Sequence, residues 1–217
     1  MRHLLNKELR LAASPLSFLF LAGGLMTMLP GYPILMGAFF VCLGIFYSFL
    51  RSREANDVLY TVLLPVPRGD CVRAKFAFTV LLQLCAFAVC AGLTAVRMTL
   101  LSKAEPYVQN ALLNATPFFL AFVLLIFAAF NLWFVGGFFK TAYKIGGPFV
   151  AFSVAAFVLI AVAETMPHLP PLAFLQNPAG ERLSIQFAVL LAAFALYALL
   201  TFLSLRTAVR RFEQIDL

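Results

Sequence analysis

Charged side chains are scarce in this chain, and their scarcity excludes an ordinary soluble domain. Only 12% of the 217 residues are charged and 63% are hydrophobic, whereas soluble domains average about 25% charged residues. The mean hydropathy is +0.97, and apolar runs long enough to cross a bilayer core of about 30 Å recur. Nearly all of the mass lies in these runs, so the sequence predicts a single membrane domain.

Ionisable groups are nearly missing from the apolar runs, which argues against an intramembrane enzyme and an ion-coupled transporter. The runs contain Gln83 and Asn131, while Arg97 and Glu164 lie at outer ends. These two charges can snorkel to water or, less economically, pair with each other. No P-loop motif is present, so we expect no ATP hydrolysis, cofactor or metal in this chain. The four cysteines form no C-x-x-C pair and are expected to be small core residues.

The apolar runs predict six transmembrane helices, at approximately 16–29, 34–50, 77–99, 116–139, 147–164 and 184–205. In residues 1–15, leucines recur at helical spacing and charged residues fill the positions between them. This pattern predicts an amphipathic helix at the membrane interface. Residues 164–183 mix prolines with apolar side chains. We expect a segment that re-enters the membrane before the last span, or alternatively a loop lying flat on the surface.

The distribution of lysine and arginine predicts the orientation. With six spans, residues 1–15, 51–75, 140–146 and 206–217 share one side, and they carry 13 of the 16 cationic residues. Positive residues gather on the cytosolic side of membrane proteins, so both termini are predicted to be cytosolic. The net charge of +7 is then explained by topology, and no nucleic acid is expected as a partner.

Phenylalanine and paired glycines have simple expected roles. The 25 phenylalanines are expected to be mostly lipid-facing bulk. Small residues allow helices to approach closely in lipid or to be capped. These are the roles expected of Gly23-Gly24, Gly136-Gly137 and Gly146-Gly147.

The only long polar segment, residues 51–75, reads RSREANDVLYTVLLPVPRGDCVRAK. Its periodicity predicts a helix over about 53–63. Such a helix would place Leu59 and Leu63 on one face with Val62 beside them. This apolar ridge can fill a groove on a soluble partner, and the alternative is a solvated loop with a surface helix.

Charges and prolines define the two ends of this predicted helix. Glu54 and Asp57 lie near its start, where negative charge favours the helix dipole. Pro65 and Pro67 end it and turn the chain back toward the membrane.

The stretch from Glu54 to Lys75 resembles permeases of the ABC-2 family of ATP-binding cassette transporters. Members of this family often show an acidic and polar stretch, a leucine pair before Pro-x-x-Arg, and a lysine at the next span. The matching residues are Glu54, Asp57, Leu63, Leu64, Pro65, Arg68 and Lys75. Pro67, where the family more often has a small residue, is a departure. The amphipathic start and the possible re-entrant segment also match, so the resemblance covers essentially the whole chain.

The resemblance implies the membrane subunit of an exporter in the bacterial inner membrane. A separate ATPase subunit would bind ATP and Mg, and a second permease, identical or related, would complete the transporter. The cargo would be a peptide, such as an antimicrobial peptide, or a lipid-like or other amphipathic molecule. The implied ATPase-coupling residues are Glu54, Asp57, Leu59, Val62, Leu63, Leu64 and Arg68.

Two other functions remain as alternatives. A substrate-capturing membrane subunit of a small-molecule importer would also have about six spans, but it docks through helix faces and needs no long charged coupling loop. An intramembrane enzyme is opposed by the missing ionisable residues.

Overall fold

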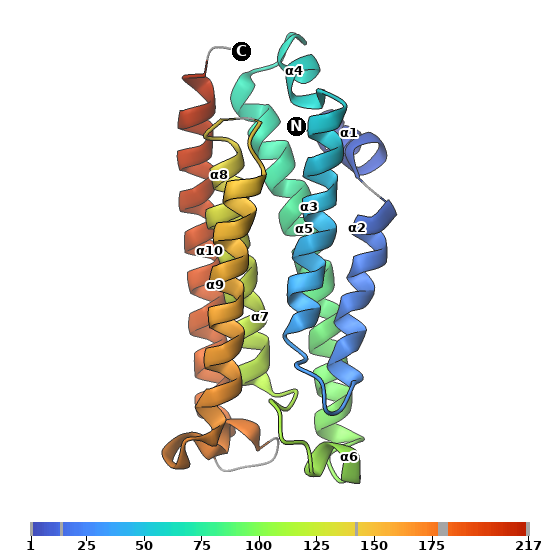
Figure 1. The fold of residues 1–217 in the computed structure, drawn as a ribbon, viewed down its shortest axis with the longest axis vertical. Helices are drawn as coiled ribbons and strands as arrows, with labels where there is room; N and C mark the ends of the chain where they lie inside the picture. The colour runs from blue at the N-terminus through green and yellow to red at the C-terminus, as the bar shows by residue number, and fades with distance from the viewer. Residues whose placement is uncertain (1, 14, 142, 178–181, 216–217) are drawn as a thin grey trace.

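The computed structural model describes residues 2–13, 15–141, 143–177 and 182–215, and helices are the only regular elements in these ranges. Figure 1 shows long helices running side by side as an elongated bundle. The predicted all-helical class is confirmed.

The long helices include α3 (Met36–Glu54), α5 (Arg68–Thr99), α9 (Gly146–Thr165) and α10 (Leu183–Glu213). Two further rods are composite: α2 (Pro15–Leu19) with η2 (Phe20–Met28), and α7 (Pro117–Ala129) with η3 (Phe130–Val135) and α8 (Gly136–Phe138). The short elements are α1 (Arg2–Lys7), η1 (Glu8–Ala12), α4 (Asp57–Val62), α6 (Glu105–Val108), η4 (Met166–His168) and η5 (Pro170–Gln176). Two helices extend beyond the predicted spans, because α5 begins at Arg68 and α10 continues to Glu213.

The connections divide between the two ends of the bundle. The two ends of the chain and α4 lie at one end, together with the α8–α9 connection, whereas α6 and the turns η4 and η5 lie at the other (Figure 1). We call the first the α4 end. The chain therefore begins and finishes on the same side of the bundle.

Four helices of the described chain are long and apolar enough to cross a membrane: Arg68–Thr99, Pro117–Phe138, Gly146–His168 and Leu183–Glu213. A fifth span would come from His3–Arg10 and Pro15–Met28, which meet at a bend of 87°. Helix α3 is not among them, and its last turn carries Arg51 and Arg53. The chain is a multi-pass membrane protein, but the predicted count of six spans is not confirmed.

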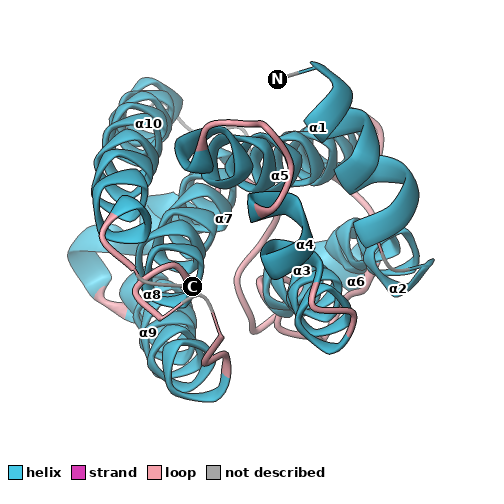
Figure 2. Cartoon of the chain, turned by 90° about the horizontal axis from the view of Figure 1, so that it is seen from above, coloured by secondary structure: helices cyan, strands magenta, loops and turns pink. Residues whose placement is uncertain are grey.

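Helix α7 is the centre of the bundle. Twelve of its residues are buried, and α3, α5, α9 and α10 pack around it (Figure 2). The outer faces of α9 and α10 instead expose large apolar side chains such as Val154 and Leu191. An apolar exterior around a packed interior is the arrangement that suits a lipid environment.

Phenylalanine fills the interior, so the expectation of lipid-facing bulk was wrong. Eleven of the twelve largest fully buried side chains are phenylalanines. Phe49 and Phe134 lie with ring centroids 5.1 Å apart, and Phe46 and Phe149 lie 4.2 Å apart. Lipid tails are as apolar as these rings, so hydrophobicity alone does not distinguish the two faces of a membrane helix.

Small residues bring η2 and α2 close to α3, as expected for Gly23. A β-carbon added at Gly23 would lie 2.9 Å from the Gly37 carbonyl oxygen, and one added at Gly44 would lie 2.5 Å from the Phe20 β-carbon. The Ser17 hydroxyl donates to the Gly44 carbonyl at 2.7 Å. Glycine is therefore needed where these two helices cross.

A polar cluster crosses the apolar interior. Gln83 and Asn131 form a reciprocal amide pair with nitrogen–oxygen distances of 2.9 and 3.0 Å. The Tyr197 hydroxyl donates to Gln83 at 2.9 Å, and the Asn131 amide donates to Thr201 at 2.9 Å. Asn131 lies in the π-helical turn η3, and the Ser204 hydroxyl donates to its backbone carbonyl at 2.7 Å. These contacts join α5, η3 and α10.

At the opposite end, Arg97 and Glu164 do not behave as the sequence suggested. Arg97 is only 5% exposed, so it does not snorkel to water. The Glu164 carboxylate accepts a hydrogen bond from the Leu113 backbone N–H at 2.8 Å. Within the described residues the two side chains form no ion pair.

Candidate functional site at the α4 end

The predicted helix over residues 53–63 is divided in two. Helix α3 ends at Glu54, and α4 begins at Asp57. Asn56 between them has a φ of 50°, in the left-handed region. Asparagine enters this region more readily than most residues, so it allows the chain to turn there.

Helix α4 and the two residues that follow it carry an exposed apolar surface. Leu59 is 44% exposed, Tyr60 65%, Leu63 74% and Leu64 52%. We call these four residues the α4 surface. Val62 is half-buried and Glu54 is exposed, while Val58 turns into the interior. Single exposed leucines are ordinary, but four exposed large side chains within residues 59–64, at a polar end of a membrane protein, form a candidate contact surface.

A small cleft adjoins this surface. Its volume is about 200 Å³, and Asn56 and Leu59 line one side while Thr141 and Tyr143 line the other. Arg53 also lines it and lies with its guanidinium carbon 5.8 Å from the centre of the Tyr143 ring. The α4 surface is therefore continuous with a recess between α4 and the α8–α9 connection.

Arg68, one of the residues implied as an interface contact, binds within the chain. Its guanidinium donates to the Ile215 backbone carbonyl at 2.9 Å. This contact joins the start of α5 to the end of the chain just beyond α10. Arg68 is half-buried, and its guanidinium is engaged in a contact within the chain instead of being fully available to a partner.

Asp57 also turns inward, which corrects the expectation that it faces a partner. Its carboxylate accepts hydrogen bonds from Lys7 at 2.8 Å and from the Ser52 hydroxyl at 2.8 Å. Lys7 also donates to the Thr61 hydroxyl at 2.9 Å. The first turn of α4 is thereby fastened to α1.

Two further charges complete a closed ring. Lys75 in α5 lies 2.7 Å from Glu8 and 3.5 Å from Asp57. Glu8 in turn lies 3.0 Å from Lys7. We call Lys7, Glu8, Asp57 and Lys75 the charge quartet. Positive and negative groups alternate around it, and its formal charges sum to zero.

The quartet is mostly withdrawn from solvent. The side chains of Glu8 and Lys75 are each 2% exposed, and those of Lys7 and Asp57 are 17% and 20% exposed. Removing one member of a buried pair leaves an uncompensated charge and costs about 3–5 kcal/mol, whereas replacing both by apolar residues is often neutral. The quartet therefore fixes how α1, α4 and α5 fit together more than it adds stability.

The electrostatic balance at Asp57 favours its charged form. Burial alone would raise the pKa of this carboxyl, but the ammonium groups of Lys75 and Lys7 and the hydroxyl of Ser52 outweigh burial, so the pKa of Asp57 lies below its ordinary value of 3.8. The carboxylate is therefore ionised whenever the protein is near neutral pH.

Sequence reasoning missed Glu8 and Lys75 as members of this site. Glu8 was expected in an interfacial helix and Lys75 in a polar loop, and 67 residues separate them. The one signal available was an unusual concentration of both signs of charge in residues 51–75. Within the described ranges no group of three or more His, Cys, Asp or Glu side chains is arranged to hold a metal ion.

Of three comparisons with known proteins, the one with protein families gives a match. The family model for the ABC-2 family transporter protein matches residues 3–210, nearly the whole chain. Comparisons with curated proteins and with solved structures gave no match. The matched range includes the α4 surface and all four residues of the charge quartet.

Proposed function

Because the chain belongs to the ABC-2 family of transporter proteins, and is thus a membrane permease that works with an ATPase, we propose that it is the permease subunit of an exporter. It moves a peptide, a lipid-like molecule or another amphipathic substrate out of the cell. A separate ATPase supplies the energy, and a second permease, a copy of this chain or a relative, completes the transporter.

The observation that carries this proposal is the α4 surface. Leu63, its most exposed side chain at 74%, directly follows α4, which lies at the end of the bundle that holds both chain ends (Figure 1). Burying one leucine is worth about 1.5–3 kcal/mol. A soluble ATPase with a complementary groove would therefore gain substantial binding energy from this surface alone.

The charge quartet supports a route for motion from the ATPase into the membrane helices. Asp57 at the start of α4 is bonded to Lys7, and Lys75 near the start of α5 is bonded to Glu8. A displacement of α4 must either carry α1 and α5 with it or separate buried opposite charges, which is costly. In this proposal the ATPase moves α4, and α1 and α5 follow.

The proposal includes six spans with both termini in the cytosol. Both ends of the chain and α4 lie at one end of the bundle (Figure 1), as an even number of crossings requires. Helix α3 would be the short span, leaving the membrane at Arg51. The 87° bend between His3–Arg10 and Pro15–Met28 suits an N-terminal helix that lies along the interface before the first crossing.

A re-entrant segment before the last span also has support. Backbone polar groups in short or irregular segments are tolerated at membrane depth only where protein groups satisfy them. The Gln186 amide donates to the Phe174 backbone carbonyl at 2.9 Å, and the Thr116 hydroxyl donates to the Leu175 carbonyl at 3.1 Å. We therefore place η5 at the edge of the bilayer, shielded by neighbouring helices.

The test of coupling is the substitution Leu63→Asp. Truncating an interface anchor often costs 2 kcal/mol or more, equivalent to about 30-fold weaker binding. The variant should insert normally, because the side chain makes little contact within the chain, but it should lose the ATPase that co-purifies with the tagged wild-type chain.

Leu100→Asp is the matched control, since Leu100 is 78% exposed and lies at the end of α5 far from α4. It should retain the ATPase. Full ATPase recovery with Leu63→Asp would show that the α4 surface is not the coupling surface.

A further inference from the structure

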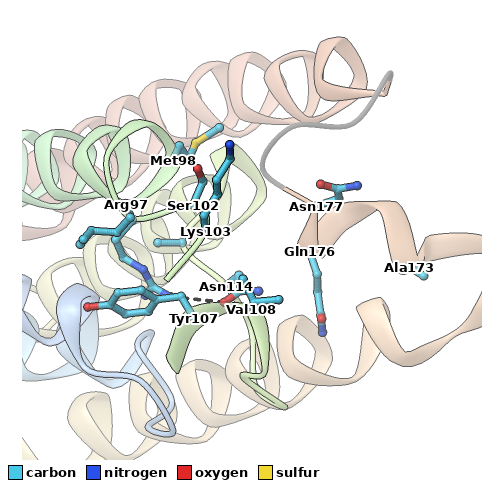
Figure 3. A pocket seen from close by; sticks show the side chains of 12 residues that line it. Arg97, Met98, Ser102, Lys103, Tyr107, Val108, Asn114, Ala173, Gln176 and Asn177 are labelled. Carbon is cyan, nitrogen blue, oxygen red and sulfur yellow. Dashed lines mark hydrogen bonds between the residues drawn. The ribbon is translucent and has the colours of Figure 1, made fainter. Parts of the chain in front are cut away.

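A pocket lies at the end of the bundle opposite α4. Its volume is about 430 Å³, within the range of about 300–1,000 Å³ typical of small-molecule sites. Figure 3 shows it between the end of α5, the α6 region and the segment that ends at Asn177. Arg97, Lys103 and Asn114 line it from one side, and Gln176 lines it from the other.

Arg97 is the unusual residue of this pocket, because it is a buried charge held by neutral groups. Its guanidinium donates to the Thr27 backbone carbonyl at 2.6 Å and to the Asn114 side-chain oxygen at 3.3 Å. The guanidinium carbon lies 4.2 Å from the centre of the Tyr107 ring (Figure 3). In the ranges that the structure describes, no carboxylate lies within ion-pair distance of it.

A guanidinium in this state is incompletely satisfied. It has five N–H donors in a planar fork that matches a carboxylate or a phosphate. Carbonyl and ring contacts reduce the cost of burying its charge, but they carry no opposite charge. An anion that reached the guanidinium from the pocket would supply that charge.

The rest of the lining has the composition expected around an anion with an apolar part. Lys103 adds a second positive charge, and no aspartate or glutamate occurs among the described lining residues. The amide side chains of Asn114 and Gln176 provide polar contacts. Apolar contact is provided by Met98, Leu101, Val108, Ala115 and Ala173.

We propose that this pocket binds the phosphate or carboxylate group of a small amphiphilic anion, with Arg97 as the principal contact and Lys103 as a second cation at the rim. The apolar lining receives the first few carbons attached to the anionic group. The anion is either the head group of an anionic lipid or a soluble amphiphile. This binding does not depend on ATP or on export.

Occupation of the pocket would reach η2 through groups already on that helix. Arg97 donates to the Thr27 carbonyl, and the Tyr107 hydroxyl donates to the Met28 carbonyl at 3.0 Å. Both carbonyls belong to the last turn of η2, where helix carbonyls lack partners within the helix. Arg97 therefore serves as a structural cap and, through its remaining donors, as an anion contact.

Hexyl phosphate is the probe that tests the proposal. The full-length chain is placed in nanodiscs of phosphatidylcholine, and binding is measured by calorimetry against empty nanodiscs. Hexyl phosphate should bind with saturable heat, and 1-hexanol, which has the same chain without the charge, should not. Raising the salt concentration should weaken the binding, because the anionic group interacts with two cations.

Three variants locate the site. Arg97→Gln should weaken binding at least about tenfold, since truncating one partner of a buried charged contact is costly. Lys103→Glu reverses an exposed charge without disturbing packing and should weaken binding at least about threefold, because it replaces an attraction of the size of a typical exposed pair by a repulsion. Arg182→Gln is the control, because Arg182 lies over the Phe174 ring at 5.3 Å and should leave affinity unchanged.

The two sources of anion are separated by the lipid. If nanodiscs containing phosphatidylglycerol abolish hexyl phosphate binding, the site holds a lipid head group; if binding persists, it holds a soluble amphiphile. Either result supports the anion site. Heats equal to those of empty nanodiscs, or an affinity that neither Arg97→Gln nor Lys103→Glu lowers, would overturn it, whatever the outcome of the Leu63→Asp experiment.

Discussion

Lys7, Glu8, Asp57 and Lys75 lie close enough that each charge has two oppositely charged neighbours. This arrangement makes their energies interdependent, because a substitution changes the balance for the three that remain. Neighbouring residues in one network are the case in which mutational effects fail to add. The quartet is therefore best probed by comparing single and double substitutions.

The first prediction at this scale concerns Glu8 and Lys75. Glu8→Gln leaves two cations facing Asp57 alone and should destabilise the chain by about 3–5 kcal/mol. Lys75→Met should also destabilise it, because Glu8 and Asp57 then share Lys7. In the double variant Glu8→Gln/Lys75→Met, the remaining charges of Lys7 and Asp57 balance each other. Its loss of unfolding free energy should therefore be clearly smaller than the sum of the losses in the two single variants. Unfolding in detergent measures all three, and simple additivity would contradict the coupling.

The second prediction concerns pH. The pKa of Asp57 is lower in the folded chain than its ordinary 3.8, so its stabilisation is fully present above about pH 3.8 and is lost as pH falls through the folded value. Asp57→Asn should be less stable than wild type at about pH 7, and the difference in stability should narrow as the pH falls below about 3.8. Unfolding in detergent across this range measures it. A gap that stays constant would show that the Asp57 charge is not stabilising.

Individual residues were predicted unevenly from the sequence. Leu59 and Leu63 were expected on one face of a helix over residues 53–63; both are exposed, although α4 covers only Asp57–Val62. The inward direction of Asp57 and the intrachain bond of Arg68 did not follow, because their partners, Lys7 and Ile215, lie far away in the sequence. Local patterns contain no information on such pairs.

Close helix contact at α3 gives a prediction at the scale of elements. Replacing glycine by alanine inside a helix gains about 0.5–1 kcal/mol where space allows. At Gly44 the added β-carbon would lie 2.5 Å from that of Phe20, whereas at Gly92 nothing lies within 4 Å. Gly44→Ala should therefore destabilise the chain by about 1–3 kcal/mol, and Gly92→Ala should not.

Thermal unfolding of the two glycine variants in the same detergent provides the comparison. Both substitutions lie in long helices and add the same methyl group, so helix propensity cancels between them. Equal stability of the two variants would mean that the α2–η2 rod does not press against α3.

The elements themselves were predicted well where apolar runs are long, and less well where polar residues continue a helix. The sequence placed α9, and the composite rod of α7, η3 and α8, within a few residues. It began the third predicted span at residue 77, but α5 begins at Arg68, because Arg68 donates to the Ile215 carbonyl and Lys75 pairs with Glu8 from other segments of the chain. The division of α3 from α4 depended on one left-handed residue, Asn56, which periodicity does not reveal.

Orientation is the prediction that belongs to the whole molecule. Glu54 is the last residue of α3, beside α4, and Lys103 lies just before α6. Both residues are exposed, and α4 and α6 lie at opposite ends of the bundle (Figure 1). A single cysteine introduced at Lys103 or at Glu54 is treated in intact cells with a membrane-impermeant maleimide. We expect labelling at position 103 and none at position 54, because 13 of 16 cationic residues lie on the α4 side. The background should lack the four native cysteines. Labelling at position 54 alone would reverse the orientation.

The family followed from the sequence more securely than the number of spans. The polar segment and its leucine pair carried the resemblance, and the family match covers residues 3–210. Span counting depends on how apolar a helix must be to count as a span, and the last turn of α3 carries two arginines. A membrane boundary within a helix is a property of the surrounding lipid as well as of the chain.

All four members of the charge quartet are encoded in the first 75 residues. During synthesis they emerge together with α1, η2, α3 and the first turns of α5, before α7 exists. The N-terminal part of the bundle can therefore be locked in register while the ribosome is still making the rest. A variant with an unmatched charge in the quartet would therefore be misassembled as soon as the first turns of α5 are made. Protein quality control could recognise that error before the central helix α7 is in place.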